Sequence, residues 1–331
     1  VVPNKPWVIG MLFCKALIPQ FILPFDVACG NYKNRRHYSC VAMRLPQTAT
    51  ADSLAKRTAT MQLSLSVRIA EEFHSKEEAS MPIGDLARLA KRCGYGALCM
   101  RASQVGVHSP SEVVEEVAGC LAETGLAVSM VTGDFDTVYN NEKGPSALTN
   151  ITPYLDLAKR LGAPRIRVAL KLESDIANAR RAADEAAEHG IQLVHQCHTL
   201  SLFETVESIE RTLSAIDRPN FGLVYEPANL EICGQDYGQA TIERLAKWIF
   251  NVYLQNQLLK PDGALTLPTW CGGDVSFDLI SVHSPGGVDF DRVFAGLKAV
   301  GYDGTVTVHQ SAQPGETPEK SASGTANFLR G

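Results

Sequence analysis

Short apolar stretches alternate with amphipathic stretches from residue 61 to the end of the chain. In the first of them, Leu63, Leu65, Val67 and Ile69 alternate with polar residues, which is the pattern of a half-buried β-strand. The later apolar stretches are more continuous, as in strands that are buried on both faces. They predict strands at residues 97–100, 126–131, 165–170, 191–195, 221–225, 249–254 and 305–308.

A helix is predicted in the interval after each of the first seven strands. Several of these helices are followed by a glycine, such as Gly94, Gly125 or Gly162, which suits the left-handed residue after a helix end. One helix begins at Ser109-Pro110-Ser111-Glu112, where a hydroxyl cap, a proline and a first-turn acid follow one another. The helices are expected over residues 83–93, 109–125, 153–161, 175–189, 203–216, 241–247 and 289–300.

This alternation of eight strands with helices predicts a parallel sheet covered by helices. The length of residues 61–331 matches a (β/α)8 TIM barrel of class α/β. A doubly wound open sheet is the alternative fold. Because no Gly-x-Gly-x-x-Gly sequence follows a predicted strand, we expect no nucleotide cofactor.

Residues 1–60 differ from the remainder of the chain. They contain eight Lys or Arg residues against two Asp residues and show no clear helical or strand period. An apolar run at residues 8–29 is interrupted by Lys15 and broken by Pro19 and Pro24, which argues against a membrane-spanning helix. We expect a poorly structured N-terminal extension. A targeting segment and a genuine structural element are the alternatives.

Composition narrows the class of protein. The chain has 331 residues, of which 45% are hydrophobic, and a net charge of −5, which argues against nucleic acid as its main partner. Its nine cysteines have no zinc-type spacing and are odd in number, which favours reduced thiols over a disulfide framework. We therefore expect a cytoplasmic protein with no membrane partner.

Polar residues follow the predicted strands. In a barrel of this type the C-terminal strand ends form the mouth, where binding and catalytic residues gather. The residues at these ends are Arg68, Arg101, Asp134, Lys171, Gln196, His198, Glu226, Tyr253, Gln255, Asn256, His309 and Gln310. The set suits a polyhydroxylated or anionic small molecule. Structural alternatives are an ion pair for Arg68, a helix cap for Asp134 and a core position for Tyr253.

The stretch at residues 257–287 is longer than the other intervals and rich in turn residues, so a loop is expected. Trp270 lies in it and is a candidate for covering the mouth and stacking on a sugar ring. The alternatives are that Trp270 packs this loop onto the barrel or onto a second subunit of a homo-oligomer.

Three motifs resemble those of the sugar phosphate isomerase/epimerase-like barrels, which are related to xylose isomerase and endonuclease IV. The resemblance covers residues 65–310. Its motifs are Gln196-Cys197-His198, Glu226-Pro227-Ala228-Asn229, and the pair Gly287-Val288-Asp289-Phe290 with Gly301-Tyr302-Asp303-Gly304. In sugar epimerases of this family, a divalent cation is held by Glu, Asp, His and Glu from strands five to eight, and the two glutamates exchange the substrate proton.

This chain departs from the family at each of those positions. Gln196 stands where the family has Glu, and Glu226 where Asp is usual. Tyr253 stands where the metal-binding His belongs, and His309 where the second Glu belongs. The resemblance therefore implies the fold, while the metal and the two-carboxylate mechanism do not transfer intact.

Two kinds of site remain open. Gln196, Glu226 and His309 form a tentative ligand set for Mn²⁺, Mg²⁺ or Zn²⁺, with His198 nearby. Without a metal, His309 is a candidate general base because the ordinary pKa of histidine is near neutrality. Arg101 or Lys171 would then stabilise an enolate.

The resemblance implies an isomerase or epimerase that removes a proton next to the carbonyl of a sugar. A lyase that acts by β-elimination and a carbohydrate-binding barrel without catalysis are the alternatives. The predicted catalytic residues are His309, Glu226 and His198. The predicted substrate-binding residues are Arg101, Lys171, Tyr253, Gln255, Asn256 and Trp270. A nuclease is disfavoured, because too few histidines lie at strand ends for a multi-zinc cluster.

Overall fold

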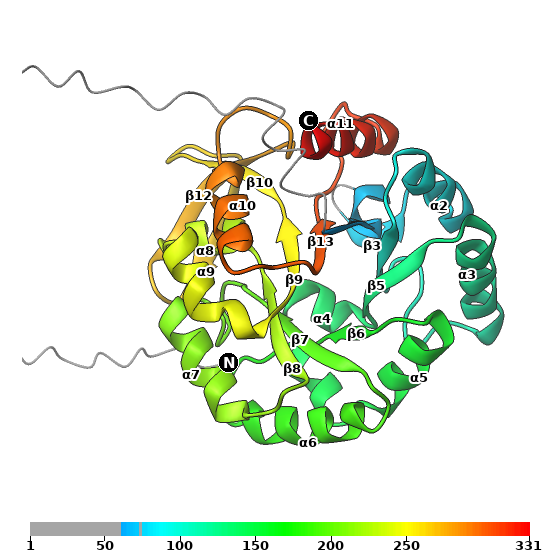
Figure 1. The fold of residues 1–331 in the computed structure, drawn as a ribbon, viewed down its shortest axis with the longest axis horizontal. Coiled ribbons are helices and arrows are strands. Elements are labelled where there is room, and N and C mark those ends of the chain that lie inside the picture. Colours follow the sequence, from blue (N-terminus) through cyan, green and yellow to red (C-terminus); the bar gives the residue numbers. More distant parts are fainter. Residues whose placement is uncertain (1–60, 73–74) are drawn as a thin grey trace, which may run out of the picture. The chain divides into compact units, whose positions relative to one another are not determined.

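A closed barrel of eight parallel strands forms the centre of the protein (Figure 1). The computed structural model describes residues 61–72 and 75–331. The barrel strands, in chain order, are β1 (Gln62–Ser66), β4 (Ala97–Arg101), β5 (Ala127–Thr132), β6 (Arg165–Arg167), β7 (Gln192–Gln196), β8 (Phe221–Tyr225), β9 (Ile249–Leu254) and β13 (Thr305–Val308). β13 pairs with both β9 and β1, which closes the ring. The predicted TIM barrel is confirmed. The predicted extension over residues 1–60 lies outside the described residues.

Helices surround the barrel as a ring (Figure 1). They are α2 (Ile83–Arg92), α3 (Ser111–Thr124), α5 (Thr152–Leu161), α6 (Asp175–Ala187), α7 (Val206–Ile216), α9 (Gln239–Leu245) and α10 (Phe290–Ala299). Each overlaps a predicted helix. Two short helices follow strand ends, α4 (Phe135–Tyr139) after β5 and α8 (Pro227–Ile232) after β8. Single 3₁₀ turns lie at η2 (Gly144–Leu148) and η3 (Ala246–Trp248).

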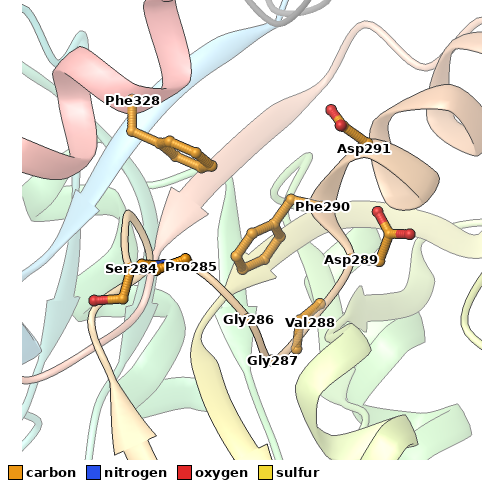
Figure 2. A pocket seen from close by; sticks show the side chains of 9 residues that line it. All are labelled: Ser284, Pro285, Gly286, Gly287, Val288, Asp289, Phe290, Asp291 and Phe328. Carbon is orange, nitrogen blue, oxygen red and sulfur yellow. The ribbon is translucent and has the colours of Figure 1, made fainter. Parts of the chain in front are cut away.

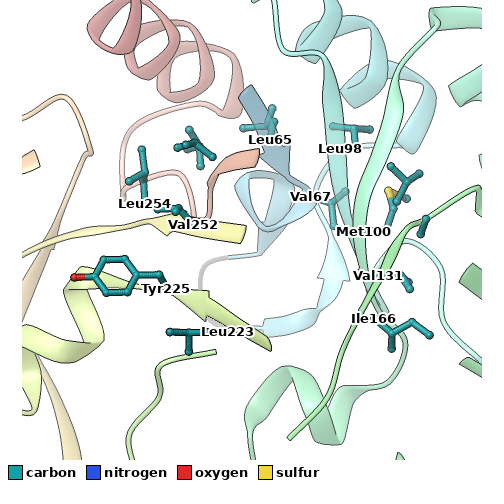
Figure 3. Packing of buried hydrophobic residues seen from close by; sticks show 14 of the residues in the cluster. Leu65, Val67, Leu98, Met100, Val131, Ile166, Leu223, Tyr225, Val252 and Leu254 are labelled. Atoms are coloured by element: carbon teal, nitrogen blue, oxygen red, sulfur yellow. The ribbon is translucent and has the colours of Figure 1, made fainter. Parts of the chain in front are cut away.

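Side chains alternate along the strands between two apolar clusters. Leu98 and Met100 of β4 belong to the large cluster that packs the strands against the helices, part of which is shown in Figure 3. Cys99, between them, belongs to a small cluster inside the barrel. The other fully buried members of the inner cluster are Met130, Val194, Val224 and Tyr253. This alternation decides which residues reach the barrel mouth.

The first strand is shorter than predicted. β1 ends at Ser66, and the residues predicted to continue it form the 3₁₀ helix η1 (Val67–Ala70). The Ser66 hydroxyl accepts a hydrogen bond from the Arg68 backbone N–H at 3.3 Å, so Ser66 caps the turn. Val67 and Ile69 are nevertheless buried, and their burial explains why the apolar alternation continues past the strand end.

The prediction of a loop at residues 257–287 was wrong for most of its length. β10 (Asn256–Leu259), β11 (Leu265–Thr269) and β12 (Gly273–Ile280) form an antiparallel three-stranded sheet in the order β10-β12-β11. Few positions of the sheet are fully buried, and its strands carry polar and turn-forming residues such as Pro268 that weaken the apolar signal.

A two-stranded hairpin and the last helix were also not predicted. β2 (Glu71–Glu72) and β3 (Ser75–Ala79) form a hairpin after η1. α11 (Pro318–Arg330) ends the chain and packs Ala322, Ala326 and Leu329 into the core. No helix within the described residues has both the length and the apolar character needed to cross a bilayer.

Candidate active site

Strand alternation delivers a set of polar side chains to the barrel mouth. Side chains two positions apart in a strand share a face, so the residue two places beyond each inner-cluster residue also faces inward. Starting from Cys99, Val194, Val224 and Tyr253, and from Thr307 of β13, the rule gives the five residues Arg101, Gln196, Glu226, Gln255 and His309; from Met130 it gives Thr132, which was not predicted. All five were predicted from the sequence, and all five are buried.

Arg101 is held in place by a buried carboxylate. Its Nε donates to Glu71 Oε1 at 2.7 Å, and both side chains are at most 2% exposed. The Ser103 hydroxyl donates to the same oxygen at 2.8 Å. Because Glu71 comes from the β2–β3 hairpin, this pair joins the hairpin to the end of β4. A buried ion pair of this kind fixes the direction of the guanidinium.

His309 is neutral and bonded at both nitrogens. Its Nε2 lies 3.3 Å from Arg101 Nη1, and its Nδ1 lies 3.1 Å from Ser66 Oγ. Since a guanidinium can only donate, Nε2 accepts and the ring proton is on Nδ1. Burial, with the nearby charges of Arg68 and Arg101, holds the pKa of His309 well below its ordinary value.

Glu226 is a second buried carboxyl group at the mouth, and Arg68 and Arg167 act on it electrostatically. Its Oε2 accepts hydrogen bonds from Gln196 Nε2 and, at 2.7 Å, from Asn229 Nδ2. Burial raises the pKa of Glu226 to about 7, against the lowering effects of the Gln196 hydrogen bond and of Arg68 and Arg167. At neutral pH this group can therefore both accept and release a proton.

Cationic groups outnumber carboxylates at the mouth. Arg68 donates to Gln255 Oε1 at 2.8 Å, and its pKa is lowered to about 10 by burial and by Arg101. Arg167, at the end of β6, is 1% exposed. The pKa of Lys76 is lowered to about 7, first by burial and then by repulsion from Arg68 and Arg101. The mouth thus concentrates positive charge that a bound anion would neutralise.

Several buried polar atoms at the mouth have no partner among the described residues. They are Glu71 Oε2, Arg101 Nη2, Thr132 Oγ1, Arg167 Nε, Gln196 Oε1 and Glu226 Oε1. Buried polar atoms are nearly always hydrogen-bonded in proteins, so such a group is expected where a ligand supplies the missing bonds. Two guanidinium N–H groups, an amide oxygen, a hydroxyl and two carboxyl oxygens suit a ligand that carries both oxyanions and hydroxyls.

The tentative metal ligands Gln196, Glu226 and His309 do not suit a divalent cation in this arrangement. Gln196 points its amide nitrogen at Glu226, and both nitrogens of His309 are used. Three guanidinium groups act electrostatically on His309 or Glu226, and they would repel a dication. A single carboxylate is also a weak charge complement for a hard cation.

His198 and Lys171 both bond to Asn140 and take no part in the Arg101–His309 contact. His198 Nδ1 is 3.1 Å from Asn140 Nδ2 and 3.0 Å from the Thr199 carbonyl oxygen. Burial, then Arg167, lowers the pKa of His198 to about 3. Lys171 Nζ donates to the Asn140 carbonyl oxygen at 2.6 Å. Asn140 thus links both residues to the end of α4.

The remaining predicted residues have varied surroundings. Asn256 is fully buried, and its amide bonds to backbone atoms of Ser281, Ser284 and Val288, so it holds the loop after β12. The Tyr253 hydroxyl lies 3.3 Å from Cys99 Sγ inside the barrel. Trp270 is 54% exposed, in the β11–β12 turn. The structural alternative for Asp134 is confirmed, since its side chain caps α4 by accepting from Thr137 N.

Sequence reasoning missed Glu71, Arg167 and Lys76. Arg167 had a usable signal, because it is a charged residue within a predicted buried strand. Glu71 and Lys76 had none, because they belong to a polar hairpin of ordinary surface composition that folds back onto the mouth.

One of the sequence motifs, Gly287-Val288-Asp289-Phe290, lines a pocket. The pocket is lined by residues 284–291 and by Phe328 of α11, and Figure 2 shows these side chains. Gly287, in this lining, has φ +72°, and a Cβ there would collide with Asn256 Oδ1 and the Gln257 carbonyl oxygen. Gly287-Val288-Asp289-Phe290 is therefore a structural motif that lets the loop approach Asn256 closely.

Comparisons with known proteins agree with this architecture. A model of the xylose isomerase-like TIM barrel family matches residues 87–331. An inosose dehydratase from Geobacillus thermodenitrificans is 26% identical over 135 residues, which are 40% of this chain and 45% of that protein. The chain thus spans less than half the length of this relative.

Solved structures resemble the fold at low sequence identity. A probable 3-DHS dehydratase, AsbF, from Bacillus anthracis has a TM-score of 0.59 at 16% identity, covering 80% of this chain and 98% of that one. A D-allulose 3-epimerase from Methylomonas sp. has a TM-score of 0.60 at 16% identity, covering 82% and 97%.

A third similar structure is a xylose isomerase-like TIM barrel protein from Mycobacterium smegmatis in complex with magnesium. Its TM-score is 0.58 at 15% identity, and the match covers 82% of this chain and 96% of that one. A divalent metal therefore has a precedent on this fold. Of the three enzymes described above, two are dehydratases and one is an epimerase. Since the family model matches most of the chain, the protein belongs to the xylose isomerase-like TIM barrel family.

Proposed function

We propose that this protein is an enzyme that removes a proton next to the carbonyl of an anionic keto-sugar and eliminates the neighbouring hydroxyl group as water. The observation that carries the proposal is the buried carboxyl of Glu226. It has one oxygen without a partner and a pKa of about 7, and it lies among guanidinium groups.

Glu226 supplies both proton transfers. As a carboxylate, its Oε1 takes the proton from the carbon next to the carbonyl, and the electrons of the broken C–H bond form the enolate. The enolate then restores the carbonyl and expels the hydroxyl from the next carbon, which takes the proton from the Glu226 carboxylic acid. Water leaves, a C=C bond remains beside the carbonyl, and Glu226 returns to its ionised form. A pKa near the working pH suits a group with both tasks.

The guanidinium groups stabilise the negative charge of the enolate and bind the substrate anion. Arg101 is preorganised by Glu71 and keeps Nη2 free, while Arg167 keeps Nε free. Fixed donors in a buried site need no reorganisation as charge develops. When one of these two guanidinium groups faces the enolate, the other remains, and a carboxylate elsewhere on the substrate is its natural partner.

His309 positions Arg101 in this proposal. Its Nε2 is already bonded to Arg101 and its pKa is low, so it is poorly suited to remove a proton. The same cation cluster supports a site that works without a bound metal, since it supplies the positive charge that a Lewis acid would otherwise provide.

Elimination fits the residues better than epimerisation does. Inversion of a carbon needs proton transfer on both faces, hence two acid–base groups. Of the two buried glutamates at the described mouth, Glu71 is neutralised by Arg101 at 2.7 Å, which leaves Glu226. The names of the partial relative and of one structural neighbour, both dehydratases, support the same class of reaction.

Solvent exchange tests the proposal. The full chain is incubated in deuterium oxide with the matched pairs D-fructuronate and D-fructose, and D-tagaturonate and D-tagatose. With the carboxylated member of a pair, a transient enone absorbance is expected, followed by deuterium uptake at the carbon that lost its hydroxyl as the enol product becomes a diketone. Both should be lost in Glu226→Gln. Glu243→Gln, on the exposed face of α9, is the control.

Other results would redirect the proposal. Deuterium uptake with a rearranged ketose and no enone would replace elimination by isomerisation. Binding of these sugars to wild type and Glu226→Gln alike, without exchange, would identify a carbohydrate-binding barrel that lacks catalysis.

A further inference from the structure

A cluster of two thiols and a carboxylate lies outside the proposed active site. Glu204 lies in the loop between β7 and α7, Cys233 follows α8, and Cys271 lies in the β11–β12 turn. One oxygen of Glu204 and the two Sγ atoms all lie within 4.8 Å of one another. Among the described residues, this is the one group of three His, Cys, Asp or Glu side chains arranged in this way.

We propose that Glu204, Cys233 and Cys271 form a binding site for a thiophilic divalent cation such as Zn²⁺. Zinc takes Cys sulfur at about 2.3 Å and carboxylate oxygen at about 2.0 Å in a tetrahedron, which requires ligand atoms about 3.5–3.8 Å apart. The three ligand atoms already lie within 4.8 Å of one another, so a bound cation would need to draw them closer by about 1 Å. A sulfur-rich set selects zinc over magnesium or calcium.

The charge balance around Glu204 supports the site. Its carboxylate is 4% exposed and accepts backbone N–H groups of Leu200, Trp270 and Cys271 at 2.8–2.9 Å. No Lys or Arg side chain of the described residues forms an ion pair with it. A buried carboxylate without a cation is costly. A dication bound to it and to two thiolates leaves the net charge at −1, as in the free cluster, but places a positive centre directly against the carboxylate oxygen.

Access and the fourth ligand follow from the burial of the two cysteines. Cys233 is buried, whereas Cys271 is exposed, so a cation can enter from solvent and retain a water molecule as its fourth ligand. Cys271 Sγ already lies 3.5 Å from the Cys233 carbonyl oxygen, which brings the two thiol-bearing segments together before binding.

A bound cation would fix the position of the sheet formed by β10, β12 and β11. The three ligands come from segments that follow β7, α8 and β11, so one cation would join the sheet to two loops of the barrel. Trp270 directly precedes Cys271, and the cation would therefore also fix the backbone that carries this exposed side chain.

Cobalt substitution tests the site without reference to activity. The full chain is reduced with tris(2-carboxyethyl)phosphine under argon and titrated with Co²⁺. One equivalent is expected to give a near-ultraviolet thiolate-to-cobalt band with strong tetrahedral visible bands, which Zn²⁺ then removes. Both bands should be lost in Cys233→Ser and in Cys271→Ser and weakened in Glu204→Gln, while Cys93→Ser and Cys120→Ser retain them.

Three outcomes would overturn the site. They are absence of a thiolate band at one equivalent, a band that survives in the Cys233→Ser/Cys271→Ser double variant, and a weak octahedral spectrum that Glu226→Gln abolishes. A Cys233–Cys271 disulfide in protein purified without reductant, seen as a cross-linked peptide by mass spectrometry and with no metal uptake after reduction, would also replace the proposal. Zn²⁺ should raise the melting temperature of wild type and of Cys93→Ser, and leave that of Cys271→Ser unchanged.

Discussion

The ring of Tyr253 lies flat against the imidazole of His309, with ring centroids 3.9 Å apart and planes 11° apart. The two residues come from neighbouring strands of the barrel, Tyr253 from within β9 and His309 from the end of β13. The stack limits the rotation of the imidazole and so supports its hydrogen bonds to Ser66 and Arg101. Tyr253 thus acts on the mouth through His309.

Substitution of Tyr253 separates this stack from the hydroxyl group. Tyr253→Phe keeps the ring and loses one hydrogen bond to Cys99, so a loss of about 0.5–1.5 kcal/mol in the free energy of unfolding is expected. Tyr253→Ala removes a fully buried ring and should cost about 3–5 kcal/mol. Urea unfolding measures both values. Equal losses in the two variants would show that the stack contributes nothing.

The pH dependence of catalysis should follow Glu226. The base form of this group is present above its pKa of about 7, so kcat/KM for proton exchange should rise with pH through that value. Glu226→Gln should lower the rate by about 10²- to 10⁴-fold. His309→Gln should raise KM and leave the midpoint of the pH profile in place. A midpoint that moves in His309→Gln would instead make His309 the general base.

The stability of the fold should also depend on pH through Glu226. It should fall as the pH rises, whereas the rate of proton exchange rises. The folded-state pKa of Glu226 is raised above the ordinary value of 4.5, so its protonation stabilises the fold. This contribution is fully present below about pH 4.5 and is lost as the pH rises through about 7.

The difference in unfolding free energy between wild type and Glu226→Gln isolates this effect. It should fall by an amount on the order of 3 kcal/mol between the two pH limits, since one pKa unit corresponds to about 1.4 kcal/mol. Urea titrations at a series of pH values measure it. A difference that stays constant, or that grows in favour of wild type with rising pH, would mean that the folded-state pKa of Glu226 is not raised.

The Glu71–Arg101 pair should be important for stability as well as for the site. Glu71→Gln leaves the Arg101 guanidinium buried without its counter-charge, which is expected to cost about 3–5 kcal/mol. Asp85→Asn is the matched control, because Asp85 and Arg88 form an exposed pair whose loss should be small. Thermal unfolding of both variants gives the comparison, and similar losses would contradict the burial argument.

The barrel could be predicted from the sequence because its strands are short apolar runs buried on both faces. The five inward-facing residues Arg101, Gln196, Glu226, Gln255 and His309 were predictable for the same reason, since each lies at a strand end. The β2–β3 hairpin was not, because a two-residue strand and a five-residue strand of mostly polar residues leave no periodic signal. Its Glu71 and Lys76 reach the site only through tertiary contacts.

The chemistry was harder to predict than the positions. That His309 accepts from Arg101, and that Arg167 keeps a free donor, depend on contacts between strands far apart in the sequence. The Glu204–Cys233–Cys271 cluster was hidden for a similar reason. Its cysteines are 38 residues apart in the chain, and spacing patterns detect ligands only when they are close in sequence.

Gly287 should tolerate no side chain, whereas Gly301 should tolerate one at moderate cost. Both have positive φ, +72° and +69°, so an alanine at either position strains the backbone by about 1–2 kcal/mol. At Gly301 nothing lies within 4 Å of the added Cβ, but at Gly287 the Cβ would collide with Asn256 and Gln257.

Gly287→Ala should therefore lose clearly more stability than Gly301→Ala, because the loop must also move away from the Asn256 amide that bonds to Val288 N at 3.0 Å. Urea unfolding of both variants measures the difference, and Asn256→Ala in the Gly287→Ala background tests its cause. If the loop is displaced as expected, the added loss from Asn256→Ala should be smaller in that background than in wild type. Full additivity would place the strain elsewhere than at this contact.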